Sequence, residues 1–306
     1  MTLSDFIFLK ENLNTSDCLG SDTALGNIFI LQERYKIKTH IKEKYLLREF
    51  GYSESIKGFA FPLALKNQNE NLLESFLLEI TDGYVKKEVQ LCLFSEYQKK
   101  EFDIFLQEQS FPYKIEWKNN PADNDYIYLQ NDLKILPGKK LQKKRNHISQ
   151  FQRRFETIHF EYFDKISFSK AIYDDFIFVA ESWIKEQLVE LADYKSEIES
   201  LKLALKNIGV FDFTGGVLYV DGKPVAVTLA SKISDKVLDI HFEKCLGEAA
   251  SYGGYAVINN LFIKYCEPFH YVNREEDLGL EGLRKAKLSY KPEIILEKFY
   301  GILIKN

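Results

Sequence analysis

The chain has 306 residues, of which 45% are hydrophobic and 28% are charged, and its formal net charge is −4. This length suits two domains, and no apolar run approaches the ~20 residues of a membrane-spanning helix. The segment Phe6–Leu9 is too short for a signal-peptide core. The four cysteines show no Cys-x-x-Cys spacing, so we expect free thiols and a cytoplasmic protein.

The first half of the chain predicts alternating helices and strands. In chain order we expect helices over Leu3–Leu9 and Ser21–Lys36, strands over Tyr45–Phe50, Lys57–Leu65, Phe76–Thr81 and Val89–Phe94, a helix over Tyr97–Glu108 and a strand over Tyr126–Leu129. A helix with many basic side chains follows from about Lys139 to Phe155, and then a strand near Ile158–Phe163.

The second half predicts a similar order of elements. We expect helices over Lys170–Gln187 and Tyr194–Asn207, strands over Val210–Thr214, Gly216–Val220, Val225–Ser231 and Val237–Glu243, a helix over Tyr255–Cys266, a strand over His270–Asn273, a helix over Leu280–Leu288 and a closing strand over Ile294–Ile304. The Asp221-Gly222 pair is a hairpin signal between two of these strands.

A short internal match relates the two halves. The strand Tyr126–Leu129 and the Asp132-Leu133 pair parallel the strand His270–Asn273 and the Asp277-Leu278 pair, and each is followed by a glycine and a basic residue five positions later. A match at this separation suggests duplication of a whole domain. We therefore predict an α+β fold of two similar domains, residues 1–160 and 161–306.

The segment from Lys134 to Arg154 contains no acidic residue, although the whole chain is acidic. A local basic patch favours an anionic partner such as a phosphate, a nucleic acid or a lipid head group. A solvated basic helix face is the alternative. Within this segment Lys143, Lys144 and Arg145 are the candidate anion-binding residues.

Several kinds of site leave no motif in the sequence. There is no Gly-x-Gly-x-x-Gly after a strand, no Walker A loop and no Gly-x-Ser-x-Gly elbow. His-x-x-x-His spacing and cysteine–histidine clusters are also absent, so we expect no metal site.

The turn before the expected helix Tyr255–Cys266 is a candidate anion site. Backbone N–H groups at Gly253, Gly254 and Tyr255, next to Tyr252, would lie at a helix N-terminus and favour negative charge. The pyrophosphate of coenzyme A or a nucleic-acid phosphate would suit it. Alternatively, the two glycines only make the loop flexible.

On the preceding strand, Asp239, His241 and Glu243 alternate, so we expect them on one face. Three titratable groups on an interior strand are costly unless they line a cleft or are paired. Glu243, or else His241, could act as general base for an attacking amine or hydroxyl. A polar sheet face with satisfied side chains is the alternative.

A third candidate cluster follows the expected strand His270–Asn273. Asn273 and Arg274 lie at its carboxyl end, where α/β sheets tend to place their sites. On the next helix, Arg284 and Lys287 have the spacing of one helix face, which surface ion pairs with Glu281 could also explain.

The runs NREEDLGLEGLRKAKLSYKP, DLKILPGKKLQKKRNHISQF and IHFEK resemble a bacterial family named for the C-terminal domain of phosphatidylglycerol lysyltransferases. The resemblance covers essentially the whole chain. It implies tandem GNAT-like domains related to the Fem peptidyltransferases, which use aminoacyl-tRNA as donor. By this resemblance, Glu243, Asn273, Arg274, Asp277, Gly282, Arg284 and Lys287 are site candidates in the second domain. Their anion-binding counterpart in the first is Lys143, Lys144 and Arg145, to which the resemblance adds Asn146 and His147.

This chain departs from that family in two respects. The lysyltransferases carry an integral-membrane portion, which no segment here predicts. GNAT pyrophosphate loops usually carry glutamine or arginine before their glycines, whereas this chain reads Glu248-Ala-Ala-Ser-Tyr-Gly-Gly. This departure weakens the expectation of coenzyme A or acyl-CoA, which stays an alternative donor to aminoacyl-tRNA.

We expect an acyl- or aminoacyltransferase without a metal. Its acceptor would be a small molecule, a peptide or a lipid head group, and it would be a monomer or dimer. Glu243 or His241 would deprotonate the acceptor, and Arg274 or Lys287 would neutralise charge on the donor. The alternative is a non-catalytic anion- or RNA-binding module that uses the basic helix at residues 139–154.

Overall fold

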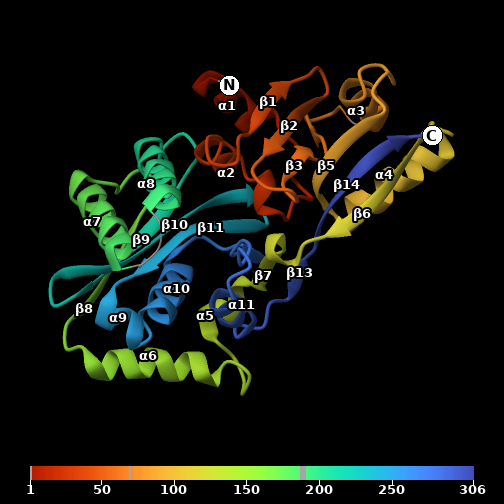
Figure 1. The fold of residues 1–306 in the computed structure, drawn as a ribbon. Coiled ribbons are helices and arrows are strands. Elements are labelled where there is room, and N and C mark those ends of the chain that lie inside the picture. Colours follow the sequence, from red (N-terminus) through yellow and green to blue (C-terminus); the bar gives the residue numbers. More distant parts are fainter. Residues whose placement is uncertain (1, 69, 187–190) are drawn as a thin grey trace. The chain divides into compact units, whose positions relative to one another are not determined.

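The computed structural model describes residues 2–68, 70–186 and 191–306, which form two compact units (Figure 1). The first unit contains Met1–Asp125, Glu276–Glu281 and Ile295–Asn306. The second contains Tyr126–Glu275 and Gly282–Ile294. None of the described helices combines the length and apolar character needed to cross a lipid bilayer.

This division differs from the expected single boundary near residue 160. The first unit ends at Asp125, and the chain returns to it for Glu276–Glu281 and for the C-terminal residues. A single boundary cannot divide a chain whose C-terminal residues return to the first unit. No change of composition marks this return, because the returning C-terminal strand alternates as its neighbouring strands do.

The first unit is built on a sheet in the order β1-β2-β3-β5-β14-β6, with β4 paired to β2. Its strands are β1 (Lys38–Ile41), β2 (Tyr45–Gly51), β3 (Lys57–Phe59), β4 (Leu63–Ala64), β5 (Glu88–Ser95), β6 (Tyr113–Asn119) and β14 (Lys298–Lys305). Its helices are α1 (Leu3–Asn12), α2 (Leu25–Ile30), α3 (Leu72–Ile80) and α4 (Glu96–Glu108), with short 3-10 turns at Ser21–Thr23 and Pro121–Asp123.

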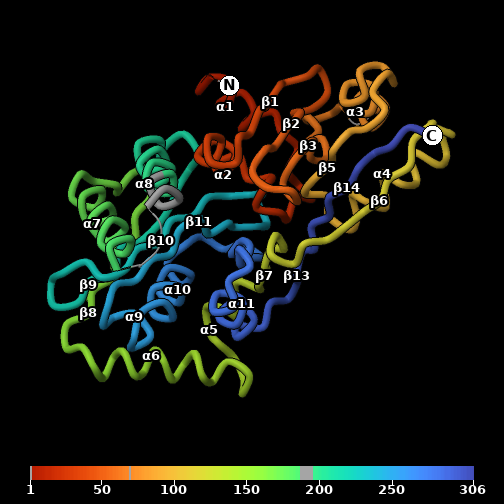
Figure 2. Tube along the Cα trace, viewed as in Figure 1, coloured from red at the N-terminus to blue at the C-terminus, as the bar shows by residue number. Residues whose placement is uncertain are grey.

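The C-terminal strand completes this first sheet. Figure 2 shows β14, in blue, between β5 and β6, and it pairs antiparallel with both. Its Leu303 is fully buried in the core formed with Phe76 of α3, Phe94 of β5 and Phe102 of α4. The last residues of the chain are therefore part of the core of the first unit.

Four expectations for the first unit differ from the structure. Lys57–Leu65, expected as one strand, forms the two short strands β3 and β4. Phe76–Thr81, expected as a strand, lies mostly in helix α3, because Leu72, Phe76, Leu77 and Ile80 form one apolar helix face. Ser21–Lys36, expected as one helix, is a 3-10 turn and the short helix α2, followed by turns. Strand β6 was not expected, although its alternation of partly and fully exposed residues is typical of a strand.

The second unit contains a sheet in the order β13-β7-β12-β11-β10-β9-β8. Its strands are β7 (Asp125–Leu129), β8 (Ile158–Phe163), β9 (Thr214–Val220), β10 (Lys223–Ser234), β11 (Val237–Cys245), β12 (Tyr271–Asn273) and β13 (Ile294–Leu296). Its helices are α5 (Gln130–Ile135), α6 (Gln142–Arg154), α7 (Lys170–Glu186), α8 (Leu191–Lys206), α9 (Gly247–Ser251), α10 (Gly254–Tyr265) and α11 (Glu281–Leu288).

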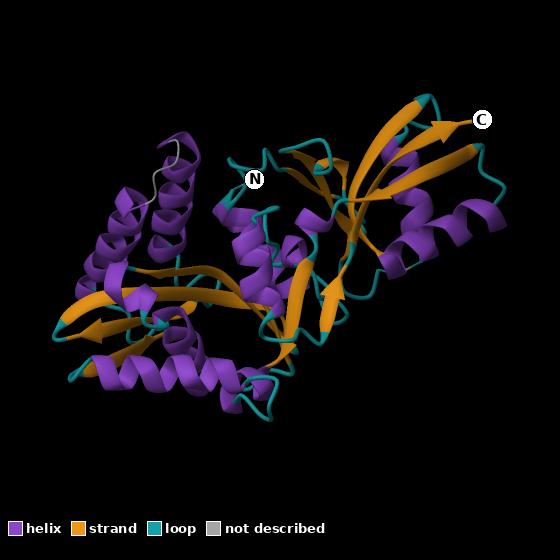
Figure 3. Cartoon of the chain, turned by 60° about the horizontal axis from the view of Figure 1, so that its bottom comes forward, coloured by secondary structure: helices purple, strands orange, loops and turns teal. Residues whose placement is uncertain are grey.

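Helices cover both faces of this second sheet (Figure 3). Helix α10 packs on one face through Ile258, Phe262 and Ile263. Helix α7 packs on the other face, against β10 and β11. Helix α10 also connects the parallel strands β11 and β12, as a crossover helix does.

The internal match does not mark equivalent positions in two sheets. Strands β7 and β12 are antiparallel neighbours in one sheet, with Tyr128 opposite Val272 and Ile127 opposite Asn273. Asp132 lies in α5, whereas Asp277 belongs to the first unit. The match therefore does not identify equivalent strands. A short strand followed by an Asp-Leu pair is too common a pattern to mark the same position in two sheets.

Candidate active site

The candidate site lies where β11 extends beyond its parallel neighbour β12. The two strands pair only from Val237–Tyr271 to Asp239–Asn273, whereas β11 continues to Cys245. Within that extension, Phe242 pairs with Leu229 and Ile240 with Ala230 of β10, which leaves His241 as a bulge. A bulge adds one residue and reverses the side on which the following side chains lie.

The bulge separates residues that the alternation predicted on one face. Glu243 contacts Asn259 of α10, so it lies on the face that α10 covers. His241 instead contacts Ser231 and Phe213, away from α10. The expectation that Asp239, His241 and Glu243 share a face is therefore wrong for Glu243, because strict alternation holds only for a strand without a bulge. Asp239 and His241 do lie together, with His241 Nδ1 3.5 Å from Asp239 Oδ2.

Two neighbours hold the Glu243 carboxylate. Arg274 Nη2 donates to Glu243 Oε1 at 2.8 Å, and Asn259 Nδ2 donates to Oε2 at 3.1 Å. The side chains of Arg274 and Glu243 are only 12% and 11% exposed. This is a mostly buried charged pair with a second hydrogen bond to the carboxylate, a geometry that keeps its orientation.

Arg274 is enclosed by aromatic rings. Its guanidinium carbon lies 4.8 Å from the ring centre of Tyr290 and 5.8 Å from that of Tyr128. Burial disfavours the charged form of Arg274, but the Glu243 carboxylate and the two tyrosine hydroxyls outweigh burial and raise its pKa. Lys287 is also buried, and its amine donates to the backbone oxygens of Arg274 and Glu275.

Lys144 of helix α6 reaches the same group. Its amine lies 3.8 Å from the centre of the Tyr290 ring. Burial lowers the pKa of Lys144 to about 8, with Arg274 and Lys143 acting in the same direction and Glu243 opposing them. The structure thus brings together Glu243, Arg274, Lys287 and Lys144, which the sequence placed in separate clusters.

Three polar atoms around Glu243 are buried without a hydrogen-bond partner of normal geometry. They are Thr228 Oγ1, Asn259 Oδ1 and Arg274 Nη1. Thr228 lies directly opposite Glu243 on β10 and is fully buried, and Asn259 is 1% exposed. Buried polar groups are normally satisfied by protein, water or ligand, so this group indicates a place for a polar ligand or water.

Sequence reasoning missed Asn259, Thr228, Tyr128 and Tyr290. Asn259 could have been found, because the Asn259-Asn260 pair interrupts an otherwise apolar helix. The two tyrosines left no such signal, since aromatic residues in a strand or after a helix are ordinary core residues.

His241 makes two hydrogen bonds of its own. Its Nε2 lies 2.8 Å from Ser231 Oγ, and its Nδ1 lies 3.1 Å from Glu275 Oε1 and 3.5 Å from Asp239 Oδ2. Its side chain is 1% exposed. Both ring nitrogens are engaged, which leaves His241 poorly placed as a base. Asp239, His241 and Glu275 offer one ligand atom each within 4.8 Å, so this is where a cation would fit best among the described residues.

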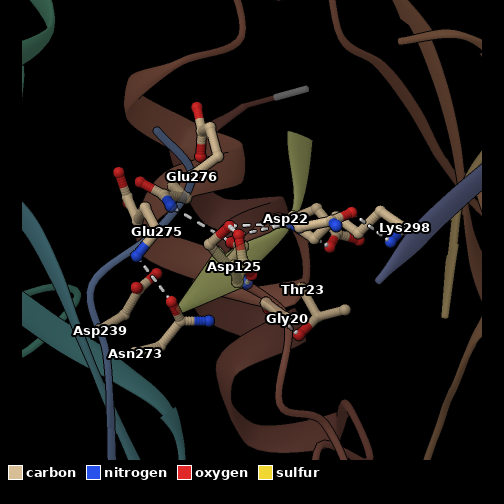
Figure 4. Close-up of polar contacts among 12 residues, drawn as sticks. Gly20, Asp22, Thr23, Asp125, Asp239, Asn273, Glu275, Glu276 and Lys298 are labelled. Carbon is tan, nitrogen blue, oxygen red and sulfur yellow. Dashed lines mark hydrogen bonds and ion pairs between the residues drawn. The ribbon is translucent and has the colours of Figure 1, made fainter. Parts of the chain in front are cut away.

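Asn273 is fully buried at the end of β12. Its Oδ1 accepts a hydrogen bond from the backbone N–H of Glu275 at 2.7 Å (Figure 4). This bond shapes the turn that carries Arg274. Arg284, a further candidate, lies half-buried on α11, one turn before Lys287. Asp277 is buried in the first unit, and Gly282 has open space around it.

The glycine turn is tightly packed. Gly253 has a φ of +100°, and a Cβ atom there would lie 2.9 Å from the Cβ and the backbone oxygen of His147. A Cβ on Gly254 would lie 2.5 Å from Cys245 Sγ. The N–H of Gly253 donates to the Ala250 oxygen. These glycines therefore allow close packing of α10 against α6 and β11, a role that the flexible-loop alternative did not include.

The tyrosines beside this turn also make packing contacts. Tyr255 accepts a hydrogen bond from Trp183 Nε1 at 3.0 Å, and Tyr252 packs edge-to-face against Phe155. The guanidinium of Arg154 lies 5.5 Å from the Tyr252 ring centre.

Helix α6 has an outer face and an inner face. Lys143 and Asn146 are exposed, whereas Lys144 and His147 point inward. Burial and the charges of Lys144 and Lys143 lower the pKa of His147. Arg145 donates to the backbone oxygens of Leu136 and Gly138, which fastens the loop between α5 and α6. Lys143 and Arg153 are exposed on the outer face, and Lys139 and Lys140 are exposed in the turn before the helix.

Comparisons with known proteins agree with this fold. A conserved protein of unknown function from Bacteroides thetaiotaomicron is 30% identical, with a TM-score of 0.84 over 99% of this chain and 98% of that chain. The L-PGS of Bacillus licheniformis is 13% identical, with a TM-score of 0.61 over 99% and 90%. A tandem GNAT protein from the clavulanic acid biosynthesis pathway is 8% identical, with a TM-score of 0.50 over 100% and 95%.

Sequence comparisons give the family. An uncharacterized protein of Mycoplasmoides gallisepticum is 24% identical over 201 residues, which is 61% of each chain and thus less than two thirds of that relative. The family model described as "Phosphatidylglycerol lysyltransferase, C-terminal" matches residues 15–301. The chain, with its tandem GNAT-like α+β fold, therefore belongs to the family of the phosphatidylglycerol lysyltransferase C-terminal domain.

Proposed function

We propose that the second unit transfers an aminoacyl group from aminoacyl-tRNA to an amine or hydroxyl acceptor, at the site around Glu243. Family and fold support an acyl- or aminoacyltransferase. The observation that carries the proposal is the Glu243 carboxylate, held by Arg274 and Asn259 and surrounded by buried polar atoms without partners.

Each of these groups has a role in acyl transfer. Glu243 takes a proton from the acceptor as its nitrogen or oxygen attacks the acyl carbonyl. Asn259 Oδ1 is an acceptor for an N–H or O–H of the substrate or of a bridging water. Arg274 Nη1 is a donor for the carbonyl oxygen as it becomes an oxyanion, in a site where few water molecules compete.

Two features favour aminoacyl-tRNA over acyl-CoA as the donor. The glycine turn, the expected pyrophosphate site, is packed against His147 and Cys245, and the N–H of Gly253 already has an acceptor. The exposed basic face of α6, which includes Lys143, can contact the phosphates of a long polyanion. Lys144, the residue after Lys143, points into the site. An RNA on α6 would thus have a route to bring its acyl end to Glu243.

The test compares donors and the Glu243→Gln variant. The purified chain is incubated with tRNA carrying a radiolabelled amino acid, or with radiolabelled acetyl-CoA, and a panel of amine and hydroxyl acceptors. We expect transfer from tRNA, and we expect Glu243→Gln to lower turnover by roughly 10²- to 10⁴-fold while tRNA binding is retained. Glu267→Gln, which alters an exposed glutamate of the same unit, is the matched control. Equal turnover in Glu243→Gln and wild type would remove Glu243 as the base.

A binding module without catalysis is the second candidate, and the basic face of α6 favours it. A variant of the exposed residue Lys143 tests RNA binding separately from catalysis. Lys143→Gln should weaken tRNA binding and reduce the slope of log affinity against log salt by about 0.7 to 0.9, because one fewer counterion is released. Salt-dependent tRNA binding without transfer to any acceptor would support the binding module and contradict the transferase.

A further inference from the structure

Lys144 differs from its two basic neighbours in helix α6. Lys143 is exposed, and Arg145 is engaged by the backbone oxygens of Leu136 and Gly138. Lys144 is half-buried, with its amine 3.8 Å from the centre of the Tyr290 ring. Tyr290 also packs against Arg274, the partner of Glu243. Of the three consecutive basic residues, Lys144 alone belongs to the candidate active site.

The charges that act on Lys144 come from its own helix, from β11 and from the turn after β12. Arg274, after β12, and Lys143, on the same helix, disfavour its protonated form, while Glu243 on β11 favours it. His147, one turn further along α6, is itself affected by the Lys144 charge. No carboxylate forms an ion pair with Lys144 among the described residues. Its ammonium group instead contacts the face of the Tyr290 ring, and the neighbouring cations Arg274 and Lys143 disfavour its charge.

The surroundings of Lys144 favour a role in proton transfer over a role as a permanent positive charge. With its pKa lowered to about 8, the Lys144 amine is mostly protonated at neutral pH but gives up its proton far more readily than an ordinary lysine. General acids work best when their pKa lies near the working pH. A residue needed only to attract phosphate would serve as well with an ordinary lysine pKa or as arginine.

We propose that Lys144 is the general acid that protonates the leaving group of the acyl donor. This inference rests on the proposed function. In the step, the acceptor nitrogen or oxygen forms a bond to the acyl carbon and loses its proton to the Glu243 carboxylate. The bond between the acyl carbon and the ribose oxygen breaks, and its electron pair stays on that oxygen. The oxygen takes one proton from the Lys144 ammonium, which becomes a neutral amine.

The step predicts a dependence on the leaving group that a structural or purely electrostatic role would not produce. A ribose oxygen is a poor leaving group and needs a proton, whereas a nitrophenolate leaves without one. Lys144→Arg keeps the positive charge but cannot donate a proton near neutral pH. The variant should therefore fail with the ribose ester and work with the nitrophenyl ester.

The experiment measures transfer to hydroxylamine from a 3′-O-aminoacyl adenosine and from the nitrophenyl ester of the same amino acid. We expect Lys144→Arg to lower kcat for the adenosine ester by roughly 10²-fold or more and to leave the nitrophenyl ester unchanged. With the adenosine ester, wild type should lose activity above a pH of about 8, and Lys144→Arg should lack that loss. Lys264→Arg, at an exposed position of α10, is the matched control and should behave as wild type with both esters.

The outcomes separate the two proposals. Wild-type transfer combined with equal kcat in Lys144→Arg for both esters overturns the role of Lys144 and leaves the proposed function standing. Absence of wild-type transfer from both esters and from aminoacyl-tRNA overturns the proposed function and the acid role with it. A direct titration of Lys144 by NMR of ¹³C-labelled lysine, assigned by loss of the signal in Lys144→Arg, needs no activity. A midpoint at the ordinary lysine value would also overturn the acid role.

Discussion

Two buried clusters of charge, one in each unit, are built on opposite plans. In the first unit, Lys298 Nζ contacts Asp125 Oδ1 at 2.9 Å and Asp22 Oδ1 at 3.2 Å (Figure 4). Arg48 Nη1 contacts Asp22 Oδ2 at 3.1 Å. This cluster pairs two cations with two carboxylates. In the second unit, the single carboxylate of Glu243 pairs with Arg274, and Lys144 adds a second cation that forms no ion pair with it.

The acceptors around each cluster also differ, although only in part. Asp125 in the first cluster also accepts hydrogen bonds from the N–H and the hydroxyl of Ser21. Around Glu243, the Thr228 hydroxyl and the Asn259 oxygen have no such partners. Arg48 Nε in the first cluster also lacks a partner, so the stronger contrast is the balance of charge, because an excess of cations favours an anionic ligand. The comparison separates a structural network from a candidate site without reference to any relative.

The pKa directions express the same contrast. Burial opposes the charge of Lys298, but Asp125 and Asp22 outweigh burial and raise its pKa, so its contribution to stability is complete below the unfolded value and is lost as the pH rises through the folded one. Burial and nearby cations lower the pKa of Lys144, so folding disfavours its charged form at neutral pH. The charge of Lys298 therefore stabilises the fold, whereas the charge of Lys144 costs stability.

The largest stability effect is expected for Lys298→Met. This change leaves the fully buried carboxylate of Asp125 without its cation, and breaking a buried ion pair from one side costs about 3–5 kcal/mol. Denaturant unfolding would measure the loss. Lys114→Met, on an exposed position of β6, is the control. Equal unfolding free energies of the two variants would contradict the structural assignment of the first cluster.

Gly254→Val is expected to have the next largest effect. A Cβ atom at this position would lie 2.5 Å from Cys245 Sγ and 2.7 Å from the Ala249 oxygen, and overpacking of this kind costs about 1–3 kcal/mol. Thermal unfolding of Gly254→Val and of Gly282→Val, where nothing lies near the added atoms, would measure it. Donor binding lost at unchanged stability would instead show that the turn is a ligand site, as the sequence suggested.

The smallest effects come from removing one hydroxyl group in each cluster. Ser21→Ala removes a donor to Asp125 and an acceptor for Lys298, and it should cost about 1–3 kcal/mol. Thr228→Val removes a hydroxyl without a partner and should change stability by less than about 1 kcal/mol. Unfolding free energies of both variants test the comparison. A larger loss in Thr228→Val would mean that its hydroxyl is satisfied within the protein.

Much of the fold could be predicted from local pattern. The strands β5, β7, β8 and β11 and the helices α4, α6, α7 and α10 agree closely with their expected ranges, because each has a clear period in its apolar residues. The prediction of a strand at Phe76–Thr81, where the structure has helix α3, was wrong because a short apolar run fits a buried helix and a buried strand equally well.

The candidate site could be predicted only in part. Glu243, Arg274, Lys287 and Lys144 were candidates, but their common location was not foreseen, because they lie on four separate segments. The bulge at His241 has no local signal, and it alone reverses the face of Glu243. His241 was proposed as a base, and its two hydrogen bonds could not be read from the spacing of residues.

The sequence by itself determined the helices and strands with a clear period, the basic face of α6 and membership of the family, since each of these depends on residues close together in the chain or on whole-chain similarity. Only the tertiary structure decided that β14 completes the first sheet, that Glu243 faces α10 and that Lys144 meets Tyr290 and Arg274. The physical reason is that burial and charge pairing depend on neighbours in space. Each of these contacts joins residues far apart in sequence, and such residues leave no periodic trace.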